Sequence, residues 1–300
     1  MCKKGGLATA SVAVLLLALT ALASFFDYEI ANALYLGQTP KENLFGIIFA
    51  FIGIIPSFVG WSFLGAGILS LSKRQIEDQK IRKWLTALSV LLFVLSFFYF
   101  CNTLMMVNNN AFKVHWAIAY PIGIAVLIGA AFWGYKLSEK IEDKELLKKV
   151  LLLVLTSLII LVVISSTKNI MNRPRFRFVL DTANPDHFRN WWQSGRDIKA
   201  SLGTSAASDE FTSLPSGHSA YSMFAVFIFP LLGDYIPSLS KYKPLLFIGG
   251  FIWWGLTAYS RLTIGAHYLS DVCIAGIVTI LAYCLANFVT RIITKKRKSL

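Results

Sequence analysis

Long apolar runs dominate this chain and decide which class of fold it can adopt. Of its 300 residues, 56% are hydrophobic and only 15% are charged, and the mean hydropathy is +0.60. Apolar runs of about 20 residues are long enough to cross a bilayer as helices. The pattern predicts an all-α, polytopic membrane helical bundle with about eight spans. The predicted spans cover residues 7–26, 44–72, 85–107, 116–135, 150–167, 217–233, 244–262 and 268–292.

The N-terminal part has two interpretations. Ala21-Leu22-Ala23 is typical of a signal-peptide cleavage site, whereas an uncleaved run would remain as a membrane helix. We favour the uncleaved helix, and either outcome leaves residue 27 on the outer side. Residues 27–43 mix polar and apolar side chains, so we expect them at the membrane interface, and Pro56 is expected to kink the second span.

Basic residues lie mainly in short loops between the apolar runs. The net charge is +13, but no basic domain outside the membrane could carry nucleic acid, so we exclude that partner and expect anionic membrane lipids instead. The N-terminus, the loops 73–83, 136–149 and 234–243, and the tail, counted with Arg291 at the end of the last span, hold 19 of the 29 Lys and Arg residues, which places them in the cytoplasm. We therefore expect a multi-pass protein of the cell membrane, and the oligomeric state stays open.

One stretch puts Arg261, His267 and Asp271 between two apolar runs. Ionisable side chains are rare in membrane segments and usually mark a site. His267 and Asp271 are four residues apart, so they share a face if the stretch is helical. An Asp beside a His can fix the tautomer and stabilise the charged ring, but a structural cap would use the same pair.

Two further polar clusters fall on the same predicted side of the membrane, at residues 168–176 and 215–218. If the three clusters converge in a bundle, their cations would bind a phosphate and stabilise its transition state. A helix that begins at the second cluster would add free backbone N–H groups. The phosphate-binding candidates are Lys168, Arg175, Ser216, Gly217 and Arg261.

Two histidines, His218 and His267, complete the predicted site. One could attack phosphorus while the other protonates the leaving oxygen, and spacing alone does not decide which. The sequence offers no carboxylate cluster suited to Mg²⁺, and its four cysteines have no paired spacing. We therefore expect no metal and no cofactor.

The three clusters together resemble the signature of the type 2 phosphatidic acid phosphatase superfamily, which includes lipid phosphate phosphatases, glucose-6-phosphatase and vanadium haloperoxidases. Its second and third parts match in full, as Pro215-Ser216-Gly217-His218 and as Ser260-Arg261 followed by His267 and Asp271. The first part matches at Lys168 and Arg175, but Phe176 stands where Pro is usual. Arg173-Pro174 offers another register with too short a spacing, so we prefer Arg175.

The resemblance covers roughly residues 150–290 and implies a role for each matching residue. His267 is the nucleophile that forms a phosphohistidine, Asp271 orients and polarises it, and His218 is the general acid. Lys168, Arg175, Ser216, Gly217 and Arg261 hold the phosphate, and no metal takes part.

The resemblance also implies an organisation of the chain. Residues 1–149 are N-terminal transmembrane helices, 150–292 form the catalytic core with the extracytoplasmic segment 168–217, and 293–300 are a basic cytoplasmic tail. Lipid phosphatases of this family usually have six spans, so eight would mean two extra N-terminal ones.

Other charged and aromatic residues of the polar segment receive structural interpretations. Asp209 and Glu210 are expected to cap or pair, and Trp191-Trp192 to anchor at the interface or to cover the path of the lipid. Five basic residues are expected to be solvated or to face headgroups: Arg173, Arg177, Arg189, Arg196 and Lys199.

The expected activity is hydrolysis of a lipid phosphate or diphosphate at the extracytoplasmic surface. Undecaprenyl diphosphate, phosphatidic acid and phosphatidylglycerol phosphate all fit, and the sequence does not choose among them. Two alternatives stay open: a lipid phosphotransferase that uses the same site, and a non-catalytic lipid carrier.

Overall fold

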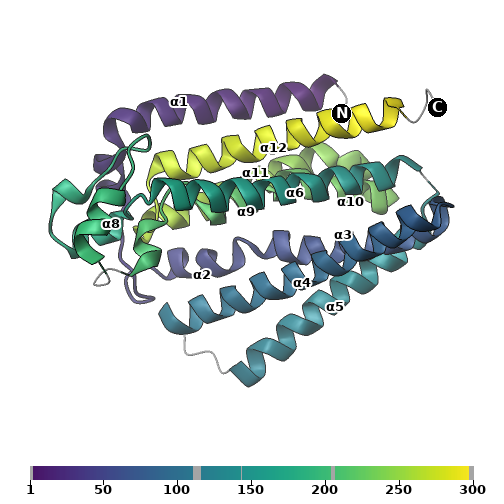
Figure 1. Ribbon diagram of the computed structural model, residues 1–300, viewed down its shortest axis with the longest axis horizontal. Helices are drawn as coiled ribbons and strands as arrows, with labels where there is room; N and C mark the ends of the chain where they lie inside the picture. Colours follow the sequence, from purple (N-terminus) through teal and green to yellow (C-terminus); the bar gives the residue numbers. More distant parts are fainter. Residues whose placement is uncertain (1–2, 111–115, 143, 204–206, 297–300) are drawn as a thin grey trace. The chain divides into compact units, whose positions relative to one another are not determined.

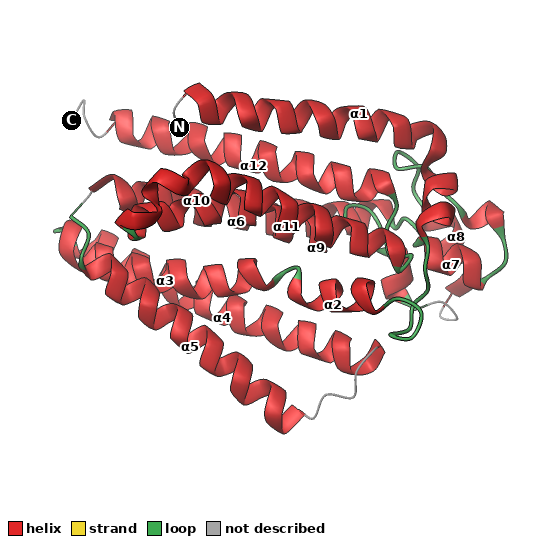
Figure 2. Cartoon of the chain, turned by 180° about the vertical axis from the view of Figure 1, so that it is seen from behind, coloured by secondary structure: helices red, strands yellow, loops and turns green. Residues whose placement is uncertain are grey.

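The computed structural model describes residues 3–110, 116–142, 144–203 and 207–296, so the end of the predicted basic tail lies outside them. The chain is 83% helical, and the described residues form no strand, which confirms the predicted all-α class (Figure 2). The α-helices are α1 (Lys3–Leu34), α2 (Leu44–Ile52), α3 (Ile55–Gln75), α4 (Gln79–Asn110), α5 (Trp116–Glu139), α6 (Lys144–Met171), α7 (Phe176–Asp181), α8 (Arg196–Leu202), α9 (Gly217–Met223), α10 (Ala225–Tyr235), α11 (Lys243–Thr263) and α12 (Leu269–Lys296) (Figure 1).

Six helical segments are long and apolar enough to cross a membrane within the described ranges. They confirm a polytopic bundle, and the total of eight spans stays a prediction. The predicted span 217–233 is divided between α9 and α10, while the span 244–262 corresponds to α11. The six segments are Thr9–Leu34, Leu44–Gln75, Gln79–Leu104, Ala117–Glu139, Glu145–Asp181 and Leu269–Ile292.

Two breaks shape the N-terminal helices. Helix α1 continues to Leu34, and a non-helical residue, Phe26, kinks it with φ −129° and ψ 19°. The segment 27–43 therefore begins as helix, whereas hydropathy alone ends the first run at residue 26. Helix α2 ends at Ile52 and α3 begins with Pro56 in its first turn, so the predicted kink is confirmed.

The chain forms two compact units, and each contains segments from distant parts of the sequence. The first consists of Met1–Ala50, Leu158–Tyr221 and Gly255–Cys284, and it contains all three charged clusters. The second consists of Phe51–Ser157, Ser222–Trp254 and Leu285–Leu300. The predicted division of the sequence at residue 149 stays a prediction.

An aromatic core holds the first unit together beside the charged clusters. Phe176 and Tyr268 are fully buried with Ala31. The ring of Phe176 meets Tyr28, Tyr35 and Tyr268 edge-on, at centroid distances of 5.6, 5.9 and 5.9 Å. The departure from the family's Pro thus places a large ring where α1, α7 and the start of α12 meet.

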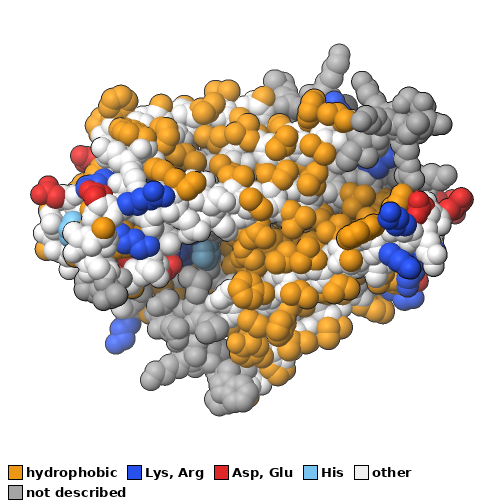
Figure 3. Space-filling model, viewed as in Figure 1, with side chains coloured by type: hydrophobic (Ala, Val, Ile, Leu, Met, Phe, Trp, Pro, Cys, Tyr) orange, Lys and Arg blue, Asp and Glu red, His pale blue; other side chains and the backbone are white. Residues whose placement is uncertain are grey.

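The second unit is built on packing between α3, α4 and α5. A close approach occurs at Gly134, where a Cβ atom would lie 2.2 Å from the carbonyl oxygen of Phe63. Outward faces remain apolar: Val94 of α4 and Ile128 of α5 are 57% and 64% exposed. Figure 3 shows such hydrophobic side chains spread along the helices, as lipid contact requires.

Candidate active site

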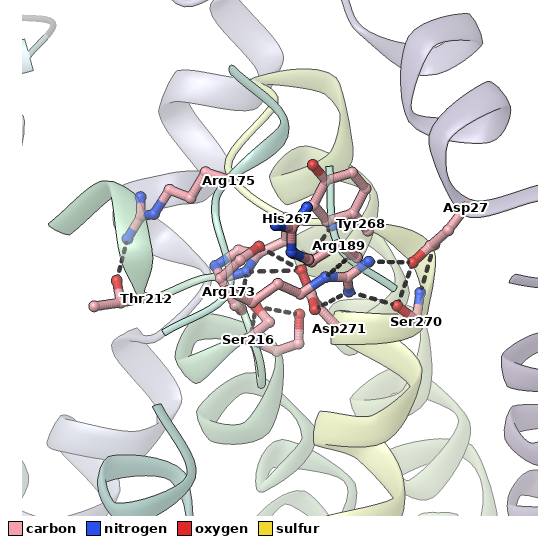
Figure 4. A network of polar contacts seen from close by, with 12 residues as sticks. Asp27, Arg173, Arg175, Arg189, Thr212, Ser216, His267, Tyr268, Ser270 and Asp271 are labelled. Carbon is pink, nitrogen blue, oxygen red and sulfur yellow. Dashed lines mark hydrogen bonds and ion pairs between the residues drawn. The ribbon is translucent and has the colours of Figure 1, made fainter. Parts of the chain in front are cut away.

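The three predicted clusters come together within the first unit. Lys168 lies near the end of α6, Ser216 precedes α9, and the connection 264–268 joins α11 to α12. The backbone N–H of Ser216 donates to the carbonyl of Asp271 at 3.1 Å. Lys168 Nζ lies 3.6 Å from the point where Gly217 would carry a Cβ atom. Helix ends distant in sequence therefore build one polar site (Figure 4).

His267 is held by a backbone carbonyl. Its ring is 1% exposed, and Nδ1 lies 2.7 Å from the carbonyl oxygen of Ser213. Because a carbonyl can only accept, Nδ1 must carry the proton, which leaves the lone pair on Nε2. The nearer carboxylate oxygen of Asp271 is 3.7 Å from Nδ1, which is within ion-pair range but too long for a hydrogen bond.

Asp271 reaches the histidine through an intermediary. Its Oδ2 accepts from the Ser213 hydroxyl at 2.5 Å and from the backbone N–H of Tyr268 at 2.9 Å. Its Oδ1 accepts from Arg173 at 2.6 Å. The carboxylate is fully buried, and these three contacts satisfy both of its oxygens.

Arg173 is buried, contrary to the expectation from the sequence. We expected it to be solvated, yet it is 0% exposed. Its guanidinium donates to Asp271, to Asp27 at 2.8 Å and to the Ser270 hydroxyl at 2.8 Å. Nε donates to the carbonyl of Arg189, and the group lies 4.1 Å from the centre of the Tyr268 ring. All three nitrogens of this cation therefore donate to protein groups (Figure 4).

Arg175 and Arg261 differ from Arg173 because each keeps an unused donor. Arg175 donates to Asp209 at 2.9 Å and to Thr212 at 3.1 Å, so Asp209 pairs as expected. The Nε atoms of Arg175 and Arg261 are buried and have no hydrogen-bond partner among the described residues. Both side chains are nearly buried, at 4% and 3% exposure. Buried, unpaired charged donors are costly, and an anion would satisfy them.

The electrostatics connect the two histidines with these cations. Burial, together with the nearby Arg175, Arg261 and Lys168, holds the pKa of His267 well below its usual range. The same three cations, Arg261, Lys168 and Arg175, also lie close enough to act on His218. Burial opposes ionisation of Asp209, but Arg175, Arg177 and Lys168 outweigh it and lower its pKa.

The sequence of the charged half also matches a protein family. The model of the PAP2 superfamily matches residues 149–298, half of the chain. The chain belongs to the PAP2 superfamily. The resemblance drawn from the three motifs is thereby confirmed, and membership supports a phosphatase-type function. Comparisons with curated proteins and with solved structures gave no match.

Two predicted phosphate ligands of this PAP2 site also have local structural contacts. The Ser216 hydroxyl accepts from the backbone N–H of Ser219 at 3.3 Å, as a helix cap does. At Gly217 an added Cβ would meet only ordinary van der Waals contacts. Their roles toward phosphate stay predictions.

Two residues of the site carried no motif signal, Asp27 and Ser213, while Arg173 was set aside because its spacing from Lys168 is too short for the motif. Ser213 contributes a backbone carbonyl, which no side-chain pattern reveals. Asp27 follows an apolar run, and a lone carboxylate in that position was a usable signal. Within the described ranges, no three His, Cys, Asp or Glu residues are grouped as a metal site would require.

Proposed function

We propose that this PAP2 protein hydrolyses a lipid phosphate or diphosphate through a phosphohistidine at His267, without a metal. The observation that supports it best is the pair of buried, unpartnered Nε donors on Arg175 and Arg261, beside the neutral ring of His267. Two guanidinium groups and Lys168 would balance the charge of a phosphate and of its transition state.

In the first step, Nε2 of His267 attacks phosphorus while the bond to the leaving oxygen breaks. His218 gives its proton to that oxygen. The ring of His267 becomes positively charged, and the buried carboxylate of Asp271 stabilises that charge from 3.7 Å. The carbonyl of Ser213 keeps the proton on Nδ1, so the ring stays in its attacking tautomer.

In the second step, water attacks the phosphohistidine and His218 takes a proton from it. The N–P bond breaks, inorganic phosphate leaves, and both histidines return to their starting states. If a second lipid took the place of water, the same site would act as a phosphotransferase.

A lipid substrate follows from the setting of the site. The polar cluster lies at the ends of apolar helices such as α6 and α12, which expose hydrophobic side chains such as Val162 and Leu281, so a chain-bearing phosphate would keep its tails in the membrane. We propose that the site faces the extracytoplasmic side of the cell membrane, opposite the Lys-rich loops. Undecaprenyl diphosphate, phosphatidic acid and phosphatidylglycerol phosphate are the candidates, and residues 176–214 would select among them.

The test is phosphate release by the purified protein from these three lipids, with EDTA present. His267→Ala should lower the rate by roughly 10³-fold or more, as loss of a covalent nucleophile does. The matched control is His187→Ala, whose ring contacts Thr182 and stacks on Phe178, away from the three charged clusters. Vanadate should inhibit the wild-type protein.

Several results would count against the proposal. Unchanged turnover in His267→Ala would show that His267 is not the nucleophile. Loss of activity in EDTA would contradict the metal-free mechanism. Labelled lipid product without free phosphate would establish the phosphotransferase. No turnover of any lipid, together with tight lipid binding, would favour the carrier.

A further inference from the structure

A buried carboxylate from the N-terminal helix reaches the site from outside the matched family region. Asp27 lies on α1, one residue after the kink at Phe26, and is 2% exposed. The PAP2 match begins at residue 149, so no family motif accounts for this side chain. A carboxylate buried this deeply is costly unless every oxygen is satisfied.

Asp27 holds two groups that flank Asp271. Its Oδ2 accepts from Arg173 at 2.8 Å and also from the Ser270 hydroxyl. Its Oδ1 accepts from the backbone N–H of Ser270 at 3.0 Å, in the first turn of α12. One carboxylate thus fixes both the cation beside Asp271 and the turn that carries Asp271 (Figure 4).

The charges explain why a second carboxylate is useful here. Arg173 is shared between Asp27 and Asp271, and all three side chains are buried. One guanidinium shared by two ionised carboxylates would leave a net charge of −1. Without Asp27, the guanidinium would neutralise Asp271 alone, and less negative charge would remain to stabilise a phosphorylated, positively charged His267.

We propose that Asp27 is a positioning residue for the phosphatase reaction, which it serves by holding Arg173 and Ser270 so that Asp271 keeps its place and its charge beside His267. This inference rests on the proposed function of His267 and Asp271. It makes α1 a part of the active site, although α1 lies outside the matched PAP2 region.

A purely structural role makes a different prediction. If Asp27 only stabilised the fold, its removal would lower the amount of folded protein, but the surviving molecules would turn over normally. If it positions Asp271, folded protein would keep its phosphate-binding cations and lose turnover. The ratio of the effect on kcat to the effect on vanadate affinity therefore separates the two roles.

The experiment measures kcat, vanadate inhibition and thermal unfolding for full-length Asp27→Asn and Asp27→Glu in the same detergent. Glu29→Gln is the matched control, since Glu29 lies on the same helix two residues away and is exposed. We expect Asp27→Asn to lower kcat by about 10- to 100-fold, because Arg173 and Ser270 would lose hydrogen bonds to a charged group. Vanadate affinity should stay within about threefold, because Lys168, Arg175 and Arg261 are untouched. Asp27→Glu keeps the charge and should recover part of the rate.

Wild-type kcat in folded Asp27→Asn would overturn the proposal, and so would an equal loss of kcat and vanadate affinity. If Asp27→Asn does not fold, Asp27→Glu decides: a lowered kcat supports positioning, and a wild-type kcat overturns it. If neither variant folds, Asp27 is needed for folding, and the positioning role is overturned. His267→Ala, measured alongside, keeps the two hypotheses apart, because an active His267→Ala overturns the proposed function itself.

Discussion

Arg173 and Arg175 are separated by one proline and have opposite environments. Arg173 donates all its hydrogen bonds to protein groups, chiefly Asp27 and Asp271. Arg175 keeps a buried Nε without a partner. Arg173 therefore pairs with the carboxylates, while the Nε of Arg175 could still donate to a bound anion.

Arg175→Ala should weaken phosphate binding. A hydrogen bond to a charged group contributes about 1.5–3 kcal/mol, so vanadate affinity should fall by roughly 10- to 100-fold. Arg177→Ala is the control, since its guanidinium pairs with Glu210 and Asp209. Inhibition curves measure both variants, and an equal effect in the two would show that Arg175 has no special place in the anion site.

His267 should be neutral throughout the physiological range. Its lowered pKa means that the folded protein binds fewer protons than the unfolded chain, whose histidines titrate near 6.5. The free energy of unfolding is therefore unaffected by His267 above about pH 6.5, and it falls as the pH drops below that value, because the unfolded chain then binds the proton more readily. Histidine NMR titration of the free protein, with His267→Asn for assignment, should place the midpoint below 6.5. A midpoint at or above 6.5 would contradict the cationic environment described here.

The residues of the candidate site could be proposed from the sequence, because cations and histidines at motif spacing suit phosphate chemistry. Their partners were not. The contact between Asp27 and Arg173 joins residues 146 positions apart, and the contact between His267 and Ser213 uses a backbone oxygen. Side-chain spacing can therefore suggest that Asp271 assists His267, but it cannot show that a serine lies between them.

At the scale of elements, the short connection between α11 and α12 depends on one glycine. Gly265 has φ +65°, where side chains are strained. A Cβ there would lie 2.9 Å from the ring of Tyr35 and 3.1 Å from Arg177. Its carbonyl also accepts from the backbone N–H of Arg177 at 2.8 Å. The position of His267, two residues later, depends on this turn.

Gly265→Ala should destabilise the first unit by about 1–3 kcal/mol and reduce turnover. Gly255→Ala on α11 is the matched control, because a Cβ there meets nothing within 4 Å and alanine favours a helix. Thermal unfolding in detergent measures both. If the two variants unfold alike, the turn tolerates a side chain and the strain argument is wrong.

Hydropathy predicted the long helices well and their ends poorly. Helix α6 runs over Lys144–Met171, whereas its apolar run covers only 150–167. Hydropathy reports the part of a helix that meets lipid, while backbone hydrogen bonds continue into the polar region. For the same reason the kink of α1 and the division of α9 from α10 were not visible in composition.

At the scale of the whole molecule, the distribution of charge predicts an orientation. Engineered cysteines at the exposed positions Asp186 and Lys80 should report opposite sides of the membrane. In intact cells an impermeant thiol reagent should label Asp186→Cys and spare Lys80→Cys. The reverse pattern would place the site in the cytoplasm and overturn the proposed location.

The bundle was predictable as a class, but its compact units were not. Spans follow from composition, since lipid requires satisfied backbones and apolar faces. Which spans associate depends on side-chain packing, such as the ring of Phe176 against Tyr28 and Tyr268. That packing brings α1 to the active site, although a division of the sequence at residue 149 separates the two.

The most direct test of the account is to trap the phosphoryl group on the protein. The enzyme would be mixed with a phosphate-labelled lipid substrate and quenched at early times in alkali, which preserves phosphohistidine. We predict label on the peptide that contains His267, absent in His267→Ala and released by acid. Label on another residue, or steady phosphate release by His267→Ala, would contradict the central claim.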